Sequence, residues 1–164
     1  MNEPIDFIEM KIPAKPDYIS VIRLTISGIA NRMGFSYEDI EDLKVALSEA
    51  VTNAVHHAYD DNKGKDVTIG FAIFKDRLEI IVTDHGKGFE GHNNTNSMKT
   101  KPFNNLSSVE ELREGGVGLF LIEALMDKVS IDNDTGGVVI SMIKHLVRDE
   151  VGHSDNTFST SETK

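Results

Sequence analysis

The chain has 164 residues, of which 39% are hydrophobic and 27% are charged, so its composition is that of one ordinary globular domain. Seventeen basic against 27 acidic residues give a net charge of −10, which disfavours direct binding to nucleic acid or to anionic membranes. There is no cysteine, which rules out disulfides and thiolate metal sites. The sequence shows no signal peptide and no apolar run of membrane-spanning length, so we expect a cytoplasmic protein.

The first part of the chain predicts one strand and two helices. Alternating apolar residues predict a strand from Phe7 to Ile12, and two prolines follow it. Asp17 is expected to cap a first helix that ends at Gly34, because glycine accepts the left-handed backbone of a helix end. Ser36 is expected to cap a second, longer helix from about Tyr37 to Tyr59.

The second part of the chain predicts strands and one short helix around a long polar loop. The loop, from Glu90 to Val109, is rich in Asn, Ser, Thr and Lys, and loops of that length are usually functional or disordered. Lys75 and Asp76 are expected to form the turn of a hairpin. The predicted strands cover about residues 67–73, 78–82, 128–131 and 138–147, and the predicted helix covers about residues 117–127.

This order of elements predicts the fold class and the domain boundaries. Helices and strands that follow one another as β-α-α-β-β-loop-α-β-β favour an α+β two-layer sandwich, in which helices cover one face of a mixed sheet. Residues 1–147 are expected to form this single domain. Residues 148–164 are polar and are predicted to be a flexible tail.

The long helix carries a carboxylate and an amide that could act in catalysis. Glu49 and Asn53 are four residues apart and therefore share one helix face. In phosphoryl transfer an asparagine oxygen can bind Mg²⁺, while a glutamate accepts a proton from the attacking hydroxyl or water. A solvated helix face is the alternative interpretation of the same pair.

Two glycine-rich segments follow. Asp84, Gly86 and Gly88 come where a strand ends, and the glycines permit close approach of a ligand while the carboxylate can accept a hydrogen bond from an amine. Gly115-Gly116-Val117-Gly118 leads into a helix, whose N-terminal NH groups can bind a phosphate. An ordinary glycine turn and a structural helix entry are the alternatives.

The order and spacing of these segments resemble one family. The Glu-x-x-x-Asn helix, the Asp-x-Gly-x-Gly turn and the Gly-Gly-x-Gly-Leu helix start are similar to the N, G1 and G2 boxes of the GHKL ATPases, which have the Bergerat ATP-binding fold. Within that family the chain resembles the RsbW-type serine-protein kinases, which inhibit sigma-B. The segments that carry the closer resemblance are FIEMKIPA at 7–14, IRLT at 22–25, IEDLKVA at 40–46 and LIEALMD at 121–127.

The resemblance implies a role for each site residue. Glu49 would be the catalytic base, Asn53 would bind ATP through Mg²⁺ as the metal ligand, and Asp84 would bind the adenine amine. The remaining cofactor-binding positions would be Gly86 and Gly88 at the base, and Gly115, Gly116, Gly118 and Leu119 at the phosphates.

The sequence departs from the family near the last strand. Family members often have Gly-Thr there, and the threonine hydroxyl helps to hold the adenine-binding aspartate or a water. Here Gly136-Gly137 lead into Val138. Either the affinity for adenine differs, or Thr135 or Ser141 takes the place of that hydroxyl.

The resemblance also implies a function and partners. It implies a homodimeric serine-protein kinase that phosphorylates a STAS-type anti-anti-sigma protein with Mg-ATP. The same protein would otherwise hold an alternative sigma factor of the sigma-B type, a regulator of stress response, away from RNA polymerase. A histidine-kinase-type ATP-binding domain that acts in trans and a non-catalytic sigma-sequestering module are the two alternatives.

Overall fold

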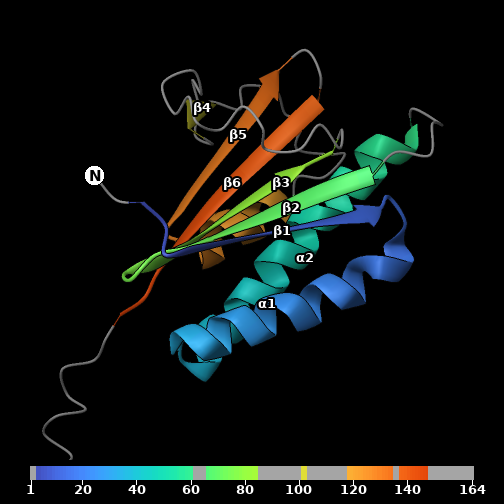
Figure 1. Ribbon diagram of the computed structural model, residues 1–164. Helices are drawn as coiled ribbons and strands as arrows, with labels where there is room; N and C mark the ends of the chain where they lie inside the picture. Colours follow the sequence, from blue (N-terminus) through green and yellow to red (C-terminus); the bar gives the residue numbers. More distant parts are fainter. Residues whose placement is uncertain (1–2, 61–65, 85–100, 103–117, 135–136, 148–164) are drawn as a thin grey trace, which may run out of the picture.

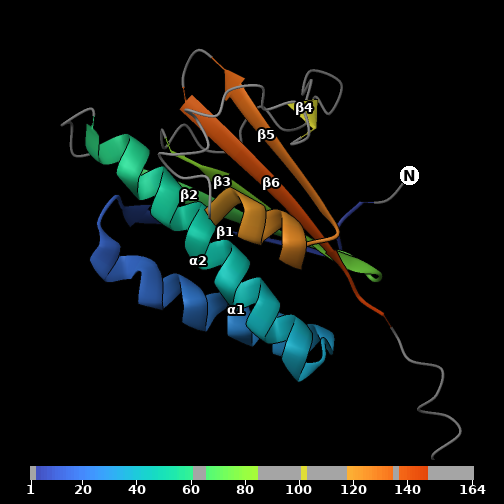
Figure 2. The same ribbon diagram turned by 180° about the vertical axis from the view of Figure 1, so that it is seen from behind.

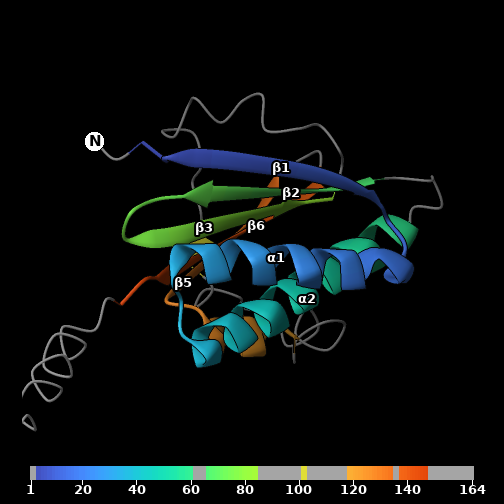
Figure 3. The same cartoon turned by 60° about the horizontal axis from the view of Figure 1, so that its bottom comes forward.

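The computed structural model describes residues 3–60, 66–84, 101–102, 118–134 and 137–147. These residues form two layers, a β-sheet and a layer of helices that covers one of its faces (Figures 1 and 3). The predicted α+β two-layer sandwich is thereby confirmed. The strands are β1 (Asp6–Pro13), β2 (Asp66–Ile73), β3 (Arg77–Thr83), β4 (Lys101–Pro102), β5 (Lys128–Asp134) and β6 (Gly137–His145), and the labelled helices are α1 (Ile19–Met33) and α2 (Tyr37–Asp60).

The sheet has the strand order β1-β2-β3-β6-β5-β4. All five described pairings are antiparallel, so the prediction of a mixed sheet was wrong in this respect. An alternating pattern places side chains on two faces but carries no information about the direction of the neighbouring strand. The tight β2–β3 hairpin, closed by a hydrogen bond of 3.0 Å from Phe74 N to Arg77 O, confirms the predicted turn at Lys75 and Asp76.

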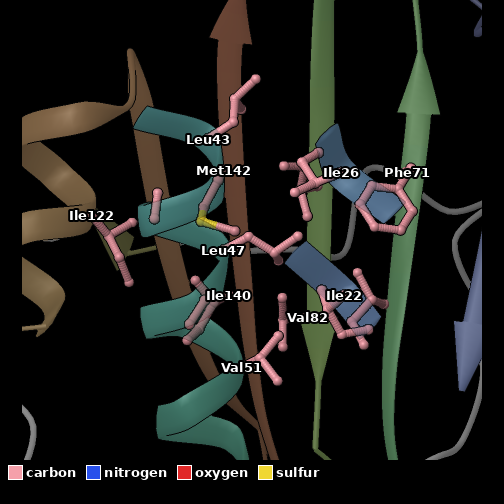
Figure 4. Packing of buried hydrophobic residues seen from close by; sticks show 14 of the residues in the cluster. Ile22, Ile26, Leu43, Leu47, Val51, Phe71, Val82, Ile122, Ile140 and Met142 are labelled. Atoms are coloured by element: carbon pink, nitrogen blue, oxygen red, sulfur yellow. The ribbon is translucent and has the colours of Figure 1, made fainter. Parts of the chain in front are cut away.

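Strand register places one set of apolar residues on the face that the helices cover. Ile8 lies opposite Phe71, Phe71 opposite Ile80, and Ile80 opposite Met142, so these four side chains share a face. Phe71, Ile80 and Met142 are buried, whereas Ile8 on the edge strand β1 is 40% exposed. Full burial of such a side chain contributes roughly 1.5–3 kcal/mol to stability. Figure 4 shows this core between sheet and helices, with Ile22, Ile26, Leu43, Leu47, Val51, Phe71, Val82, Ile122, Ile140 and Met142 labelled.

Helix α1 ends as predicted but begins differently. Gly34 has a φ of 96° and its NH donates to the carbonyls of Ala30 and Asn31, which closes the helix. At the other end a 3₁₀ turn, Pro16–Tyr18, precedes the helix, and the N-cap residue is Tyr18, with no side-chain hydrogen bond. The expected Asp17 cap is therefore wrong, because Asp17 lies inside that turn.

Helix α2 begins and ends within one residue of its prediction. The Ser36 hydroxyl accepts a hydrogen bond of 3.2 Å from the Asp39 NH, which confirms the N-terminal cap. Residues 118–125 form a further helix, which lies beside α2 in Figure 2. It ends two residues before its predicted end, because the NH of Asp127 bonds to the Ile143 carbonyl of β6, at 2.9 Å, and so leaves the helical pattern.

Several predictions concern residues outside the described ranges. The tail at 148–164 and most of the predicted loop lie there. Within the loop the structure describes β4, a two-residue strand that pairs with β5 and that the sequence pattern did not predict. Among the described residues, no helix is both long and apolar enough to cross a bilayer.

Candidate functional site

The structure brings Glu49, Asn53 and Gly118 together. Glu49 and Asn53 lie on one face of α2, as predicted, and Gly118 is the first described residue of the helix beside it. An ideal Cβ built on Gly118 would lie 2.8 Å from Glu49 Oε2 and 3.5 Å from Asn53 Nδ2. The two predicted boxes, 65 positions apart from Asn53 to Gly118, therefore meet side by side, and only glycine leaves room for the carboxylate in this position.

The Asn53 amide is available for a ligand. Its Nδ2 atom is buried and has no hydrogen-bond partner within the described part of the chain. A buried amide group without a partner is costly unless a ligand or water satisfies it. Because the two ends of an amide are assigned from its hydrogen bonds, a flip of the side chain brings the oxygen to the same position.

These residues fit a magnesium ion that is shared with a nucleotide. Mg²⁺ is commonly bound through one or two protein oxygens, while phosphates and waters complete the octahedron. Among the described residues, no group of three or more His, Cys, Asp and Glu stands at metal-binding spacing. A single amide oxygen beside a carboxylate is thus the donor set that the described chain offers to the metal of Mg-ATP.

Asp84 is fully buried directly after the end of β3. Its Oδ1 atom accepts a hydrogen bond of 3.1 Å from the NH of Val138 in β6, and its own NH donates to the Val138 carbonyl at 3.4 Å. A carboxylate in this setting is held in one orientation by the backbone of the neighbouring strand. This geometry suits the predicted role of Asp84 as the acceptor for an amine.

The Val138 hydrogen bond also bears on the departure from the Gly-Thr pattern. The residue that follows Gly137 contacts Asp84 after all, through its backbone NH rather than through a hydroxyl. Ser141 lies opposite Ile81 and Ser130 in the register, on the face of the sheet away from the helices, so it does not replace the threonine hydroxyl. Thr135 lies outside the described residues.

The remaining predicted site residues divide into two groups. Leu119 is half-buried in helix 118–125. The others lie outside the described residues, and their roles stay predictions: Gly86, Gly88, Gly115 and Gly116.

Comparison with known proteins identifies the class to which this fold and site belong. The profile of the histidine kinase-like ATPase domain matches residues 12–144, which include every site residue named above. The chain belongs to the histidine kinase-like ATPase family.

Two relatives narrow this assignment. The chain is 55% identical to a serine-protein kinase RsbW of Oceanobacillus iheyensis over 96% of this chain and 98% of the relative. It is 47% identical to the serine-protein kinase RsbW of Bacillus subtilis over 99% of both chains. Within its family the chain therefore belongs to the RsbW serine-protein kinases, and it is an ATP-dependent protein kinase. These findings confirm the prediction of a serine-protein kinase and anti-sigma factor of the RsbW type.

Two solved structures share the fold at low sequence identity. The RsbU and RsbW domains of a Mycobacterium tuberculosis protein align with a TM-score of 0.62 at 21% identity, over 89% of this chain and 34% of that one. The SiaB-SiaC complex of Pseudomonas aeruginosa aligns with a TM-score of 0.53 at 12% identity, over 84% of this chain and 89% of that one. Both support the two-layer architecture.

Proposed function

We propose that this kinase phosphorylates a serine of a STAS-type anti-anti-sigma protein with Mg-ATP, and that it otherwise sequesters an alternative sigma factor of the sigma-B type. The observation that carries the proposal is the convergence of Glu49, Asn53 and Gly118 at one place between two helices. The carboxylate supplies a proton acceptor and the buried amide a metal ligand, and the predicted helix start at Gly115-Gly116-Val117-Gly118 would supply the phosphate-binding end.

The proposed reaction transfers the terminal phosphoryl group of ATP to a serine hydroxyl. The serine oxygen forms a bond to the γ-phosphorus while the bond from that phosphorus to the bridging oxygen breaks, and ADP leaves with the electron pair. The hydroxyl proton passes to the Glu49 carboxylate. When bound, Mg²⁺ neutralises part of the negative charge on the phosphates. Asn53 would hold the metal through its side-chain oxygen, and Asp84 would accept a hydrogen bond from the adenine amine and thereby orient the nucleotide.

The proposed partners and compartment follow from the same family. A sigma factor carries basic surfaces toward polymerase and DNA, and a chain with a net charge of −10 is electrostatically suited to bind such surfaces. We propose a homodimer in the cytoplasm, without direct contact with nucleic acid or membrane.

The proposed function is tested by phosphorylation of a purified STAS-type protein with radiolabelled ATP. Acid-stable label on a serine is expected, since phosphoserine survives acid and phosphohistidine does not. Acid-labile label would favour the histidine-kinase alternative. A sigma factor bound by a protein that transfers no label to any STAS partner would favour the non-catalytic module.

A second prediction concerns the metal. Asn53→Ala is expected to weaken ATP binding about tenfold in the presence of Mg²⁺ and to leave binding in excess EDTA unchanged. The free energy of unfolding is expected to change by less than about 1 kcal/mol, because the Nδ2 atom of Asn53 has no described partner to lose. Calorimetry with and without the metal measures both affinities.

The matched control is Asn31→Ala, at an exposed asparagine of α1. It is expected to bind Mg-ATP like the wild type. A wild-type protein that binds ATP equally well with Mg²⁺ and with EDTA would contradict the assignment of Asn53 to the metal.

A further inference from the structure

Lys144 occupies an unusual position for a charged residue. It lies opposite Leu78 near the end of β6, in the same alternating series as Ile140 and Met142, and therefore on the face that the helices cover. Its side chain is only 12% exposed. A lysine that is largely removed from water requires partners that compensate its charge.

Its partners come from two helices. Lys144 Nζ donates a hydrogen bond of 2.7 Å to the carbonyl of Leu125, at the end of helix 118–125. The same ammonium lies 3.8 Å from Asp39 Oδ1 and 3.7 Å from Asp42 Oδ2, both in the first turns of α2. A cation at a helix C-terminus also interacts favourably with the helix dipole. Lys144 thus joins the end of one helix to the start of the other.

The two helices are consequently fixed to each other at two points. At one point Gly118 packs so close to α2 that a Cβ built on it would lie 2.8 Å from Glu49 Oε2, and at the other Lys144 links Leu125 to Asp42. Seven residues separate Gly118 from Leu125, and seven separate Asp42 from Glu49, so both spans measure about 10 Å along a helix. The helices therefore run antiparallel with matched spans, and Figure 2 shows them side by side.

We propose that Lys144 is a positioning residue, which holds helix 118–125 in the register along α2 that places Gly118 against Glu49 and Asn53. Without the Lys144 interactions with Leu125, Asp39 and Asp42, Ile122 still anchors helix 118–125 in the core, but the helix can shift along α2. Such a shift moves Gly118 relative to Glu49 and Asn53. It leaves Asp84 in place, because Asp84 is hydrogen-bonded to the backbone NH of Val138. The inference rests on the proposed binding of ATP phosphates near Gly118.

The test compares ATP with adenosine as probes for the full-length protein. Lys144→Met keeps the aliphatic stem and removes the charge. It is expected to weaken Mg-ATP binding about tenfold, in the range that small displacements of a site produce, and to change adenosine binding by less than about twofold. The KM for ATP is expected to rise by a similar factor. Lys144→Arg is expected to restore ATP binding to within about twofold of the wild type, because a guanidinium can bridge the same acceptors.

The matched control is Lys44→Met. Lys44 forms its ion pair with Glu41, at 3.1 Å within α2, and among the described residues its side chain makes no hydrogen bond or ion pair with helix 118–125. It is expected to bind ATP like the wild type.

Three results would overturn the proposal: unchanged ATP affinity in Lys144→Met, an equal loss of ATP and adenosine affinity, or a failure of Lys144→Arg to restore binding. If Lys144→Met does not fold, Asp42→Asn supplies the test. Asp42→Asn is then expected to bind ATP about threefold more weakly and adenosine unchanged. Unchanged ATP affinity in this variant would overturn the proposed positioning role of Lys144. A wild-type protein that binds ATP but phosphorylates no serine would refute the proposed function and leave this binding test intact.

Discussion

Glu49→Gln is expected to bind Mg-ATP nearly as well as the wild type and to transfer phosphate about 100-fold more slowly or worse. Glutamine keeps the size of the side chain and its place against Gly118, but it cannot accept the proton of the attacking serine hydroxyl. The rate of phosphoryl transfer is measured in single-turnover experiments with a STAS-type protein, and nucleotide affinity is measured by calorimetry. A loss in the rate alone separates a proton acceptor from a residue that only binds substrate.

The control for this change is Glu41→Gln, on the same helix. Glu41 pairs with Lys44 at a partly exposed position two turns before Glu49, and its change is expected to alter neither rate nor affinity. Turnover that survives in Glu49→Gln would remove Glu49 from the role of base. Loss of ATP affinity in the same variant would indicate that the carboxylate acts mainly in binding.

The sequence predicted the local structure well because its signals are local. The cap at Ser36 and the glycine stop at Gly34 each depend on residues within one helical turn, and the structure confirms both. Likewise, the shared face of Glu49 and Asn53 follows from helix periodicity alone. Helical spacing says less about how wide the buried face is: in α1, Ile22 and Ile29 are buried, but the neighbouring apolar residue Val21 is 43% exposed.

Contacts between distant segments were beyond the reach of these patterns. The antiparallel direction of every described pairing and the hydrogen bond from Val138 to Asp84 depend on how the chain returns to the sheet. The resemblance gave Glu49 and Gly118 separate roles, and no pattern placed them beside each other as the structure does. Lys144 was missed because a lysine near a strand end suggests a solvated position. Its place in the alternating series with Ile140 and Met142 was the signal that could have found it.

Gly118→Ala is expected to reduce phosphoryl transfer by about 100-fold while the protein stays folded. The new methyl group would lie 2.8 Å from Glu49 Oε2, closer than carbon and oxygen atoms approach, so the carboxylate must move. The main chain need not move, because the atom in contact is the end of a flexible side chain. Alanine is also the better helix former by about 1 kcal/mol, which offsets the local crowding. A displacement of about 1 Å at a reacting group is enough for a loss of this size.

Gly28→Ala is the matched control, because it makes the same change in α1, where no atom beyond the neighbouring residues and backbone of α1 itself lies within 4 Å of the new methyl group. It is expected to stabilise the protein by up to about 1 kcal/mol without changing turnover. The double variant with Glu49→Gln identifies the cause of the loss. If Gly118→Ala acts by displacing the carboxylate, it is expected to slow Glu49→Gln by less than about threefold further, since the proton acceptor is already gone. Losses that instead multiply would show that Gly118 acts on another group, such as the phosphates, independently of Glu49.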